Sequence, residues 1–580
     1  EKAGKTLLNE SAVNDITGDK AIGNDITGNE ASASKTVSSE ALETETSLPN
    51  FRQGDAIILY ERNRDTDNVT NKMVFKGNIE YLTENEISIR LRATQQNPSV
   101  LPAESLYAIE HDTMDTTFRS MYQGLYIYLS ARKERRDLLL SQRPPRFDES
   151  LDSMISRSED DFTRIALKAK AAQDYFLLIG PPGTGKTSCA LKKMVETFHA
   201  DKDAQILLLS YTNRAVDEIC KSLASIAPAV DFIRVGSELS CDEAYRGHLI
   251  ENELSSCNRR SEVYERIRNC RIIVGTVAAI SGKPELFRLK HFDVAIIDEA
   301  TQILEPQLLG ILCARGEDGK DAIDKFVLIG DHKQLPAVVQ QNTEQSAIYD
   351  ESLLSIGLTN LKDSLFERLY RNCTATVHRS YDMLCRQGRM HPEVALFANR
   401  AFYGGRLIPV GLPHQIESSD TICRLAFYPS VPEKVGASAK INYSEARIVA
   451  DLAVRIYEDH QADFDESRTL GIITPYRSQI ALIKKEIESL GIPALNRILV
   501  DTVERFQGSE RDVIIYSFCV NYPYQLKFLS NLTEEEGVLI DRKLNVALTR
   551  ARKQMFITGV SELLERNPLY KSLLKLIESF

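Results

Sequence analysis

Short apolar runs alternate with helix-type stretches along the chain from about residue 155 onward. The clearest apolar runs lie at 175–179, 205–210, 271–277, 293–298, 325–330, 469–474, 511–517 and 554–558. Fully apolar strands that alternate with helices are typical of parallel sheets covered by helices on both faces. The segment from about 345 to 465 separates these runs into two groups. We therefore predict an α/β fold with two domains, at 155–345 and 346–580, and a polar, helix-rich insertion at about 230–268.

The first 154 residues follow different patterns. Residues 1–48 are rich in Ser, Thr, Asn, Gly, Asp and Glu, which is typical of a disordered tail or linker. Short β-type runs at 56–60, 73–75 and 87–91 predict a small β-barrel-like accessory domain over 49–110. A helical stalk is expected over 111–154.

Apolar side chains recur on one face of this stalk. Phe118, Tyr122, Leu125 and Leu129 have the spacing of a helical face. Any amphipathic helix shows this spacing, so we interpret the stripe as a packing surface rather than a platform for stacked bases. The basic run at 132–136 is interpreted as a solvated face.

The charge balance limits the kinds of partner. The 580 residues include 71 Lys and Arg and 82 Asp and Glu, which gives a net charge of −11. No overall positive field therefore draws the chain onto nucleic acid or a membrane, and any nucleic-acid site must be local, in a cleft. No apolar run of about 18 residues is present, so we expect no membrane-spanning helix. The chain begins at Glu1 without a methionine, so we expect it to be a piece of a longer protein.

The ten cysteines form no CxxC pair and have no histidine at ligand spacing. This pattern argues against zinc or an iron–sulfur cluster and favours free buried thiols. We expect an intracellular location, cytoplasmic if the source is bacterial.

A phosphate-binding loop is the clearest chemical motif. Residues 180–187 read GPPGTGKT, directly after an apolar strand and before a helix-forming stretch. Glycines in such a loop let backbone N–H groups surround phosphates, and the lysine reaches the β- and γ-phosphates. We therefore expect ATP to bind through Gly180, Pro182, Gly183, Thr184, Gly185, Lys186 and Thr187, with the Thr187 hydroxyl on Mg²⁺.

A pair of acids follows a later apolar strand. Asp298 and Glu299 come directly after the run that ends at Ile297. An acid at a strand end can hold Mg²⁺, and its neighbour can orient and deprotonate the attacking water. Alone, the pair is more often an ordinary helix start, but the upstream phosphate loop favours the catalytic interpretation.

Further motifs follow in a characteristic order. They read SYTNRAVD at 210–217, DEATQ at 298–302, GDHKQLP at 330–336, QGRMHP at 387–392, TPYRSQ at 474–479, DTVERFQGSE at 501–510 and LNVALTRAR at 544–552. Over about 400 residues the chain resembles a superfamily 1 helicase of the 5′-to-3′ subgroup, which includes RNA-surveillance helicases and replication helicase–nucleases. The resemblance implies two RecA-like P-loop NTPase domains, with accessory domains before the phosphate loop.

The resemblance also implies roles for residues of the ATP site. Lys186 and Glu299 act in hydrolysis, Gln334 senses the γ-phosphate, and Arg389 and Arg550 act as arginine fingers from the second domain. Glu510 accepts a hydrogen bond from the ribose. Because Lys186 and Arg550 are far apart in the sequence, the hydrolytic site must be assembled between two domains.

Contacts to a nucleic-acid strand are implied in the same way. By similarity they fall on Thr212, Asn213, Thr276, Pro475, Tyr476 and Thr502. Small hydroxyl and amide groups grip phosphates and sugars without reading bases, which suits a motor that steps over any sequence. Each of these residues is about equally well explained as an ordinary turn or cap residue.

Two departures from the family pattern affect adenine recognition. Phe162 stands where relatives often have an adenine-reading glutamine, and Gln173 is too close to the phosphate loop to replace it. Relatives often have Gln-Tyr-Arg where this chain has Gln387-Gly388-Arg389. Selectivity for ATP is therefore an open question. His391 is interpreted as a packing or capping residue.

The resemblance favours a 5′-to-3′ helicase that uses ATP to translocate on single strands and unwind duplexes. DNA is favoured over RNA because 240–242 and 274–277 look more like the replication branch. The alternative is a nucleotide-gated clamp or a protein-remodelling ATPase without productive unwinding. We find no nuclease motif, so a nuclease domain, if the protein has one, is expected before Glu1.

Overall fold

The computed structural model describes residues 51–579 apart from 52–53, 84–85, 94–96, 113–115, 340, 377, 418–421, 434–437 and 536. The expected tail at 1–48 lies outside the described residues. The chain divides into two compact units, Glu1–Thr116 and Thr117–Phe580. Within the described part, none of the helices combines the length and apolarity needed to cross a membrane.

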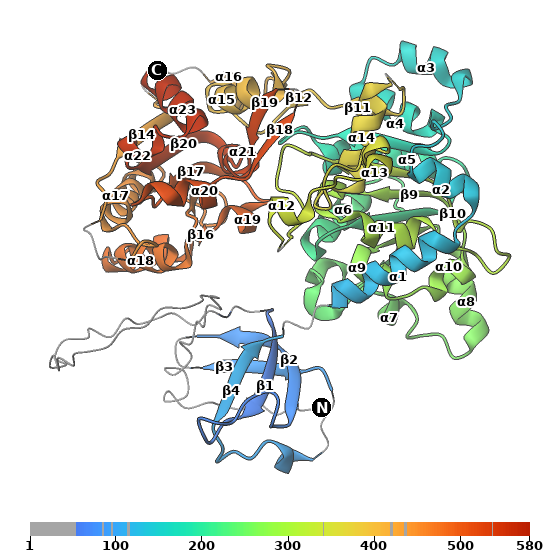
Figure 1. The fold of residues 1–580 in the computed structure, drawn as a ribbon, viewed down its shortest axis with the longest axis horizontal. Coiled ribbons are helices and arrows are strands. Elements are labelled where there is room, and N and C mark those ends of the chain that lie inside the picture. Colours follow the sequence, from blue (N-terminus) through green and yellow to red (C-terminus); the bar gives the residue numbers. More distant parts are fainter. Residues whose placement is uncertain are drawn as a thin grey trace. The chain divides into compact units, whose positions relative to one another are not determined.

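The first unit contains a small antiparallel sheet of four strands (Figure 1). Its strands are β1 (Ala56–Glu61), β2 (Val74–Leu82), β3 (Ile87–Leu91) and β4 (Tyr107–His111), in the order β3-β2-β1-β4. Alternate residues such as Ile57, Leu59 and Ile79 fill one apolar core, as expected for a sheet with one buried face. Among the described residues β3 and β4 are the two edges, so this β module is an open sheet rather than a closed barrel.

A seven-stranded parallel sheet forms the centre of the first of the two expected RecA-like domains, which lies in the second unit and is called the first motor domain below. Its order is β11-β5-β10-β9-β6-β8-β7, which is the parallel arrangement that the apolar runs predict. The strands are β5 (Tyr175–Ile179), β6 (Ile206–Ser210), β7 (Phe232–Val235), β8 (Ile272–Thr276), β9 (Phe292–Ile297), β10 (Ile323–Gly330) and β11 (Tyr381–Met383).

Helices cover both faces of this sheet (Figure 1). One core cluster joins the sheet to α4 (Asp161–Ala171), α5 (Lys192–His199) and α6 (Asn213–Ala224). The other cluster joins it to α11 (Glu305–Leu312) and α14 (Leu365–Ala375). Shorter helices of this domain are α2 (Lys133–Leu139), α3 (Asp152–Arg157), α7 (Ile250–Glu253), α8 (Arg260–Asn269), α9 (Val277–Ser281), α10 (Glu285–Leu289), α12 (Thr343–Ser346) and α13 (Glu351–Ser355).

The second motor domain is built in the same way on a five-stranded parallel sheet. Its order is β14-β20-β17-β15-β16. The strands are β14 (Leu425–Pro429), β15 (Leu470–Ile473), β16 (Leu499–Asp501), β17 (Arg511–Ser517) and β20 (Ala551–Gly559). Its helices are α15 (Pro392–Tyr403), α16 (Pro413–Ile416), α17 (Tyr443–Asp459), α18 (Arg477–Ser489), α19 (Val503–Phe506), α20 (Leu526–Leu529), α21 (Arg542–Leu548), α22 (Ser561–Leu564) and α23 (Pro568–Glu578). The core clusters again lie on both faces.

The boundary between the motor domains differs from the predicted 345/346. β11 pairs with β5, with Tyr381 opposite Leu177, so it belongs to the first sheet. Phe366 and Leu369 of α14 are fully buried in the same core. The first motor domain therefore extends to about residue 383. The sequence pattern could not reveal this boundary, because an edge strand of only three residues shows almost no hydrophobic periodicity.

The predicted insertion at 230–268 is only partly an insertion. It contains α7 and α8, but it begins with β7, which pairs in parallel with β8 at the edge of the sheet. The strand is short and contains Arg234, so its sequence does not stand out as an apolar run.

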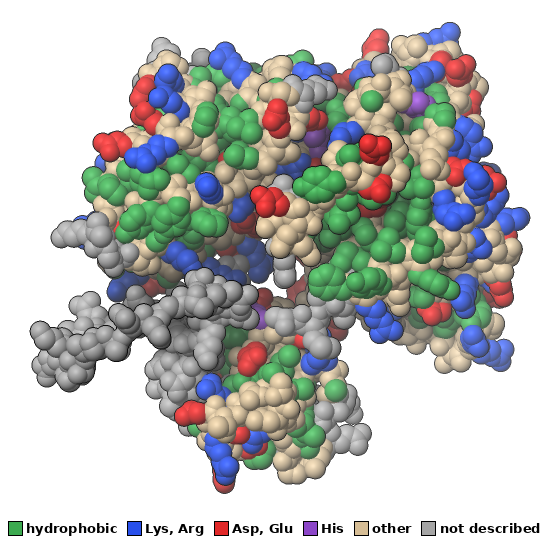
Figure 2. Space-filling model, viewed as in Figure 1, with side chains coloured by type: hydrophobic (Ala, Val, Ile, Leu, Met, Phe, Trp, Pro, Cys, Tyr) green, Lys and Arg blue, Asp and Glu red, His purple; other side chains and the backbone are tan. Residues whose placement is uncertain are grey.

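The apolar stripe of the stalk, which we interpret as a packing surface, is largely exposed in the structure. Phe118 and Tyr122 of α1 (Thr116–Ser130) are 51% and 74% exposed, and Figure 2 shows hydrophobic side chains gathered along this helix. α1 packs instead through Gly124, whose backbone approaches α11 so closely that an added Cβ would lie 2.1 Å from the Pro306 carbonyl oxygen. The buried face of this helix thus combines close backbone contact at Gly124 with the packing of Ile127 and Tyr128 against the core.

The basic run after α1 is also only partly solvated. Arg135 is 5% exposed and donates hydrogen bonds to the carbonyl oxygens of Ile323 and Asp324. It therefore fixes α2 to the start of β10.

Candidate ATP site between the motor domains

The phosphate loop connects β5 to a π-helical turn, η4 (Lys186–Leu191), which continues into α5. Gly183 and Gly185 have φ values of 72° and 75°, in the left-handed region that only glycine adopts freely. The Thr184 hydroxyl donates to the Pro181 carbonyl at 2.7 Å and closes the turn. The backbone N–H groups of such a loop form a concave site for an anion.

Four side chains meet at the end of this loop. Lys186 Nζ lies 2.6 Å from Glu299 Oε1, and Thr187 Oγ1 donates to Asp298 Oδ2 at 2.5 Å. Asp298 is 1% exposed, at the carboxyl end of β9. Parallel strands end at one edge of a sheet, which explains why residues more than a hundred positions apart in the sequence lie together.

The charges of this cluster control one another. Burial, together with the charge of Glu299, raises the pKa of Asp298 to about 6. Burial alone would also raise the pKa of Glu299, but Lys186 holds it below its ordinary value. Burial opposes the charge of Lys186, yet Glu299 and Asp298 raise the pKa of this lysine overall. Glu299 and Lys186 are therefore an ion pair at neutral pH.

Glu299 also has an unusual backbone. Its φ is 54°, in the left-handed region that non-glycine residues rarely adopt. Gln302 Nε2 donates to Glu299 Oε2 at 2.8 Å and helps to orient the carboxylate. Strain of this kind, at about 1–3 kcal/mol, is typical of functional sites.

The loop after β10 connects this cluster to the second motor domain. Gln334 Nε2 donates to Asp331 Oδ2 at 2.7 Å, and Arg550 Nη2 donates to Gln334 Oε1 at 3.2 Å. Arg550 is 2% exposed, and burial and the charge of Arg389 lower its pKa to about 9. The guanidinium is thus still charged at neutral pH and close to where a γ-phosphate would lie.

Arg389 reaches the phosphate loop from the second motor domain. An added Cβ on Gly183 would lie 2.4 Å from the Arg389 Cβ, and Gly388 N donates to the Gly183 carbonyl at 2.9 Å. The Arg389 Nε lies 2.5 Å from Glu510 Oε2. Glu510, expected to bind ribose, is here the partner of Arg389 and of Arg552, and these arginines hold its pKa below the ordinary value against the effect of burial.

All the residues that the sequence predicts for the ATP site therefore converge. The phosphate loop, Asp298, Glu299 and Gln334 come from the first motor domain, whereas Arg389, Glu510 and Arg550 come from the second. The donor set suits a nucleotide with Mg²⁺: the hydroxyl of Thr187 and the buried carboxylate of Asp298 already lie together, and oxygen ligands are what Mg²⁺ prefers.

Sequence reasoning missed Tyr403 and Asn545 as parts of this site. Tyr403 Oη donates to Asp331 Oδ2 at 2.7 Å, and Asn545 Nδ2 donates to the Lys333 carbonyl at 2.7 Å. Asn545 lies within a recognised motif, but Tyr403 lies at the end of α15 with no motif around it. Docking of the two domains gives it the contact with Asp331, in addition to the hydrogen bond of 2.8 Å that its hydroxyl accepts from Asn545 of its own domain.

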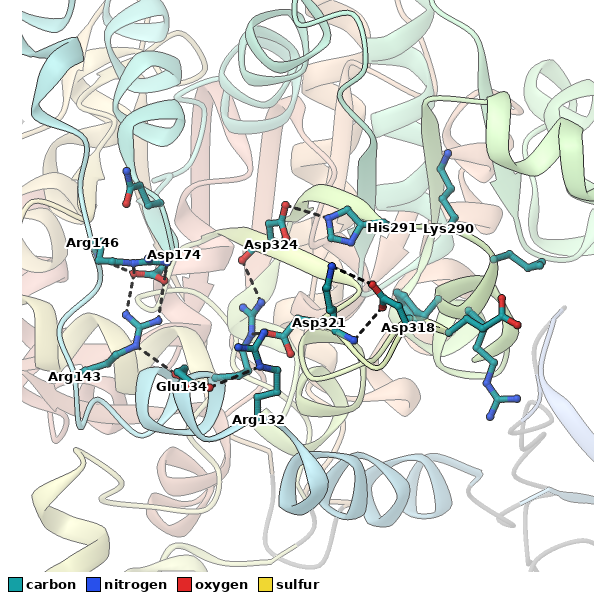
Figure 3. A pocket seen from close by; sticks show the side chains of 18 of the residues that line it. Arg132, Glu134, Arg143, Arg146, Asp174, Lys290, His291, Asp318, Asp321 and Asp324 are labelled. Carbon is teal, nitrogen blue, oxygen red and sulfur yellow. Dashed lines mark hydrogen bonds and ion pairs between the residues drawn. The ribbon is translucent and has the colours of Figure 1, made fainter.

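Two residues considered for adenine recognition lie far from each other. Phe162 lies beside the phosphate loop, because its Cζ would be 3.5 Å from a Cβ on Gly185. Gln173 instead lines a cavity of about 1170 Å³ (Figure 3). His391 accepts a hydrogen bond from Glu393 N and caps α15, as expected.

This cavity is not the nucleotide site. It lies at the amino ends of the strands, the opposite edge from the phosphate loop, and is lined by residues such as Asp174, His291 and Asp324. Its charges largely satisfy one another: Arg143 and Arg146 both bind the carboxylate of Asp174 at 2.8 and 2.9 Å (Figure 3).

The residues expected to contact a nucleic-acid strand lie at the carboxyl ends of strands. Thr212 and Asn213 follow β6, Thr276 ends β8, Pro475 and Tyr476 follow β15, and Thr502 follows β16. Thr212 and Thr276 also cap α6 and α9, accepting hydrogen bonds from Ala215 N and Ala279 N. The capping interpretation thus holds for these two residues, and Tyr476 accepts a hydrogen bond from Gln525 at 3.2 Å.

Two family models, each described as an AAA domain, match residues 157–263, 250–342 and 361–562. The DNA replication ATP-dependent helicase/nuclease DNA2 of Gallus gallus is 28% identical over 507 residues, which cover 83% of this chain and 46% of that protein. Its Homo sapiens counterpart is 27% identical, over 91% of this chain and 50% of that protein. The chain thus spans about half the length of these curated relatives.

Other matches are more distant. The DNA polymerase alpha-associated DNA helicase A of Saccharomyces cerevisiae is 24% identical, over 79% of this chain and 73% of that protein. A solved structure of arterivirus nonstructural protein 10, a helicase, with DNA matches with a TM-score of 0.36 and 15% identity, over 70% of this chain and 65% of that chain. With its two RecA-like P-loop NTPase domains and the helicase motifs in order, the chain belongs to the superfamily 1 helicases and is related to the DNA replication helicase/nucleases.

Proposed function

We propose that this chain is an ATP-dependent motor that moves 5′ to 3′ on single-stranded DNA and unwinds duplexes. The observation that supports it best is the convergence of Lys186, Glu299 and Gln334 with Arg389 and Arg550 from the other motor domain. A site that needs both domains links each turnover to their relative movement. The preference for DNA comes from the names of the helicase/nuclease relatives.

The first motor domain binds the phosphates in this proposal. N–H groups of the loop 180–187 and the ammonium of Lys186 surround them, and this requires Lys186 to exchange Glu299 for phosphate oxygens. Thr187 and Asp298 would hold Mg²⁺, which would neutralise phosphate charge.

Glu299 then accepts a proton from the attacking water. While Lys186 is its partner, the lysine lowers its pKa, so Glu299 is already ionised, as a base must be, when the nucleotide takes the lysine. Gln334 and the two arginines stabilise the charge that develops on the transferred phosphoryl group. Hydrolysis removes the charged bridge between Arg550 and the first domain, so the domains can separate and change their grip on the strand.

Steady-state ATP hydrolysis by the purified chain tests the proposal. Turnover is measured without nucleic acid, with single-stranded DNA and with RNA of the same sequence, and streptavidin displacement from either end of the DNA reports direction. We expect at least tenfold stimulation by DNA and faster displacement from the 3′ end. Stimulation without displacement would favour a nucleotide-gated clamp, and turnover that neither polymer changes would contradict a strand-driven motor.

A further inference from the structure

A small hairpin joins the second motor domain to the loop that carries Gln334. It consists of β18 (Leu532–Glu535) and β19 (Val538–Asp541), which pair antiparallel between β17 and α21. Glu535 forms the last pair of the hairpin, opposite Val538, and thus lies at its tip. No recognised helicase motif includes this hairpin.

The tip of the hairpin is bound to two consecutive residues of the first motor domain. Glu535 Oε1 and Oε2 lie 2.9 and 3.1 Å from His332 Nε2, and Oε2 lies 3.2 Å from Lys333 Nζ. Burial would raise the pKa of Glu535, but the hydrogen bond and charge of His332, aided by Lys333, lower it to about 2. The carboxylate is therefore charged at neutral pH.

Its partners lie between two residues of the ATP site. Asp331 precedes His332, and Gln334 follows Lys333. His332 is only 7% exposed, and its ring lies 4.8 Å from that of Tyr370 on α14. A contact that fixes His332 and Lys333 thus also limits where Gln334 can point.

The base of the hairpin is fixed as well. Asp541, fully buried, caps α21 and accepts a hydrogen bond from Tyr570 at 3.0 Å. The next residue, Arg542, forms an ion pair with Glu367 of α14. The hairpin thus contacts the first motor domain through Glu535 at its tip, and Arg542, directly after its base, contacts that domain as well.

We propose that Glu535 is a positioning residue for the γ-phosphate end of the ATP site. By holding His332 and Lys333, it keeps Gln334 in reach of Arg550, so the domains close into a hydrolytic arrangement only when the hairpin is seated. Charge-assisted bonds of this geometry are strong and directional, and a partly buried carboxylate loses much of its solvation when it forms them. The proposal rests on the proposed ATP-driven function.

The test compares E535Q with wild type and with E534Q. Glu534 is the neighbouring residue on the same strand, and its side chain is exposed on the opposite side. E534Q therefore removes one negative charge, as E535Q does, but leaves the contact with the first motor domain intact. We expect E535Q to lower kcat for ATP at least tenfold and to change KM and nucleotide affinity less than threefold, since the phosphate loop is intact. E534Q should equal wild type.

Hydrogen–deuterium exchange supplies a readout that needs neither DNA nor turnover. The segment 326–337 should exchange at least fivefold faster in E535Q than in wild type, whereas the loop 180–187 should not change. E535D keeps the carboxylate and should recover part of the lost kcat and protection, which separates positioning from a general loss of folding.

Several outcomes would overturn the proposal. Unchanged kcat and unchanged exchange in E535Q would show that the contact does not position the loop, and an equal effect of E534Q would assign the loss to net charge. Wild-type turnover that DNA fails to stimulate would contradict the proposed motor, while the exchange of 326–337 would still decide the role of Glu535.

Discussion

Lys186 and Glu299 neutralise each other in the structure, 2.6 Å apart. In the proposed function, an incoming triphosphate competes for the lysine, and its binding releases the carboxylate that we propose as the base. The ion pair thus neutralises both buried charges, and it occupies the Glu299 carboxylate until the lysine is withdrawn. The left-handed backbone of Glu299 fixes the direction in which the released side chain points.

Substituting Glu299 separates these two roles. E299Q keeps the shape of the side chain but cannot accept a proton, so kcat should fall at least about 100-fold, the lower range for a general base. Nucleotide affinity should stay equal or increase, because Lys186 no longer has a competing carboxylate. Turnover and titration with a fluorescent nucleotide measure the two effects, with E317Q at an exposed loop position as the control. Unchanged turnover would exclude Glu299 as the base.

Glu445 is a buried acid outside the ATP site. It is 0% exposed at the start of α17, accepts hydrogen bonds from Ser517 Oγ and Cys519 N at 2.7 and 2.8 Å, and has its pKa raised by burial to about 7. An acid whose pKa is raised in the folded state stabilises the fold while it is protonated. Its contribution is therefore lost as pH rises from its ordinary pKa toward 7.

This linkage predicts a pH-dependent stability that one substitution removes. Between pH 4.5 and 8 the ionisation of Glu445 should lower the free energy of unfolding by up to about 3 kcal/mol, at about 1.4 kcal/mol per pKa unit. E445Q should abolish this component and be more stable than wild type at pH 8. Urea unfolding at pH 5, 7 and 8 measures it, with E458Q on the exposed side of α17 as the control. Parallel pH profiles of E445Q and wild type would contradict the assignment.

At the scale of elements, the phosphate loop is shaped by what packs against it as well as by its own glycines. Gly185 is needed for its φ of 75°, but Gly183 has a second constraint, the side chain of Arg389 from the other domain. The phosphate loop and the turn before α15, which carries Arg389, therefore pack directly against each other.

Substituting Gly183 tests this contact. G183A combines backbone strain with a Cβ 2.4 Å from that of Arg389, so we expect it to keep the domains apart and to lower kcat more than tenfold. G319A is the matched control, because Gly319 has a φ of 76° and nothing within 4 Å of its added Cβ. It has the same conformational cost without the clash, and its turnover should remain within twofold of wild type. Equal effects of both variants would show that strain alone matters.

At the scale of the whole molecule, the proposed hydrolysis depends on docking between the two motor domains. Arg389 and Arg550 approach the first domain, while the Tyr403 and Asn545 contacts and the hairpin β18–β19 hold the loop 331–334. The phosphate loop by itself can bind a nucleotide but lacks the positive charge that stabilises the transferred phosphoryl group.

Removal of one arginine should therefore affect chemistry much more than binding. R389A should lower kcat at least about 1,000-fold, the lower range for an arginine finger, with nucleotide affinity within about tenfold of wild type. Single-turnover hydrolysis and nucleotide titration measure the two effects. R400A, on an exposed position of α15, is the control and should leave both unchanged. A loss of affinity as large as the loss of kcat would assign Arg389 to binding instead.

Local sequence patterns predicted the parts of this protein that depend on short stretches of chain. The apolar runs predicted both parallel sheets, because strands buried on two faces must be apolar throughout. The strand–loop–helix context of GPPGTGKT predicted the phosphate loop, and the ordered motifs predicted Asp298, Glu299, Gln334, Arg389 and Arg550, which lie around it. These features need no knowledge of distant contacts.

Tertiary structure decided the features that depend on pairing between distant segments. β11 and α14 belong to the first motor domain because β11 pairs with the edge of β5 and α14 packs on the same core. Their own hydrophobic patterns do not indicate this. The aromatic face of α1 stayed exposed because Gly124 allowed a closer backbone contact on the opposite face. Glu535 gained its charged partners, and Tyr403 its hydrogen bond to Asp331, only when the domains docked. The sequence by itself thus determined which residues can do chemistry, and the docked fold determined which of them meet.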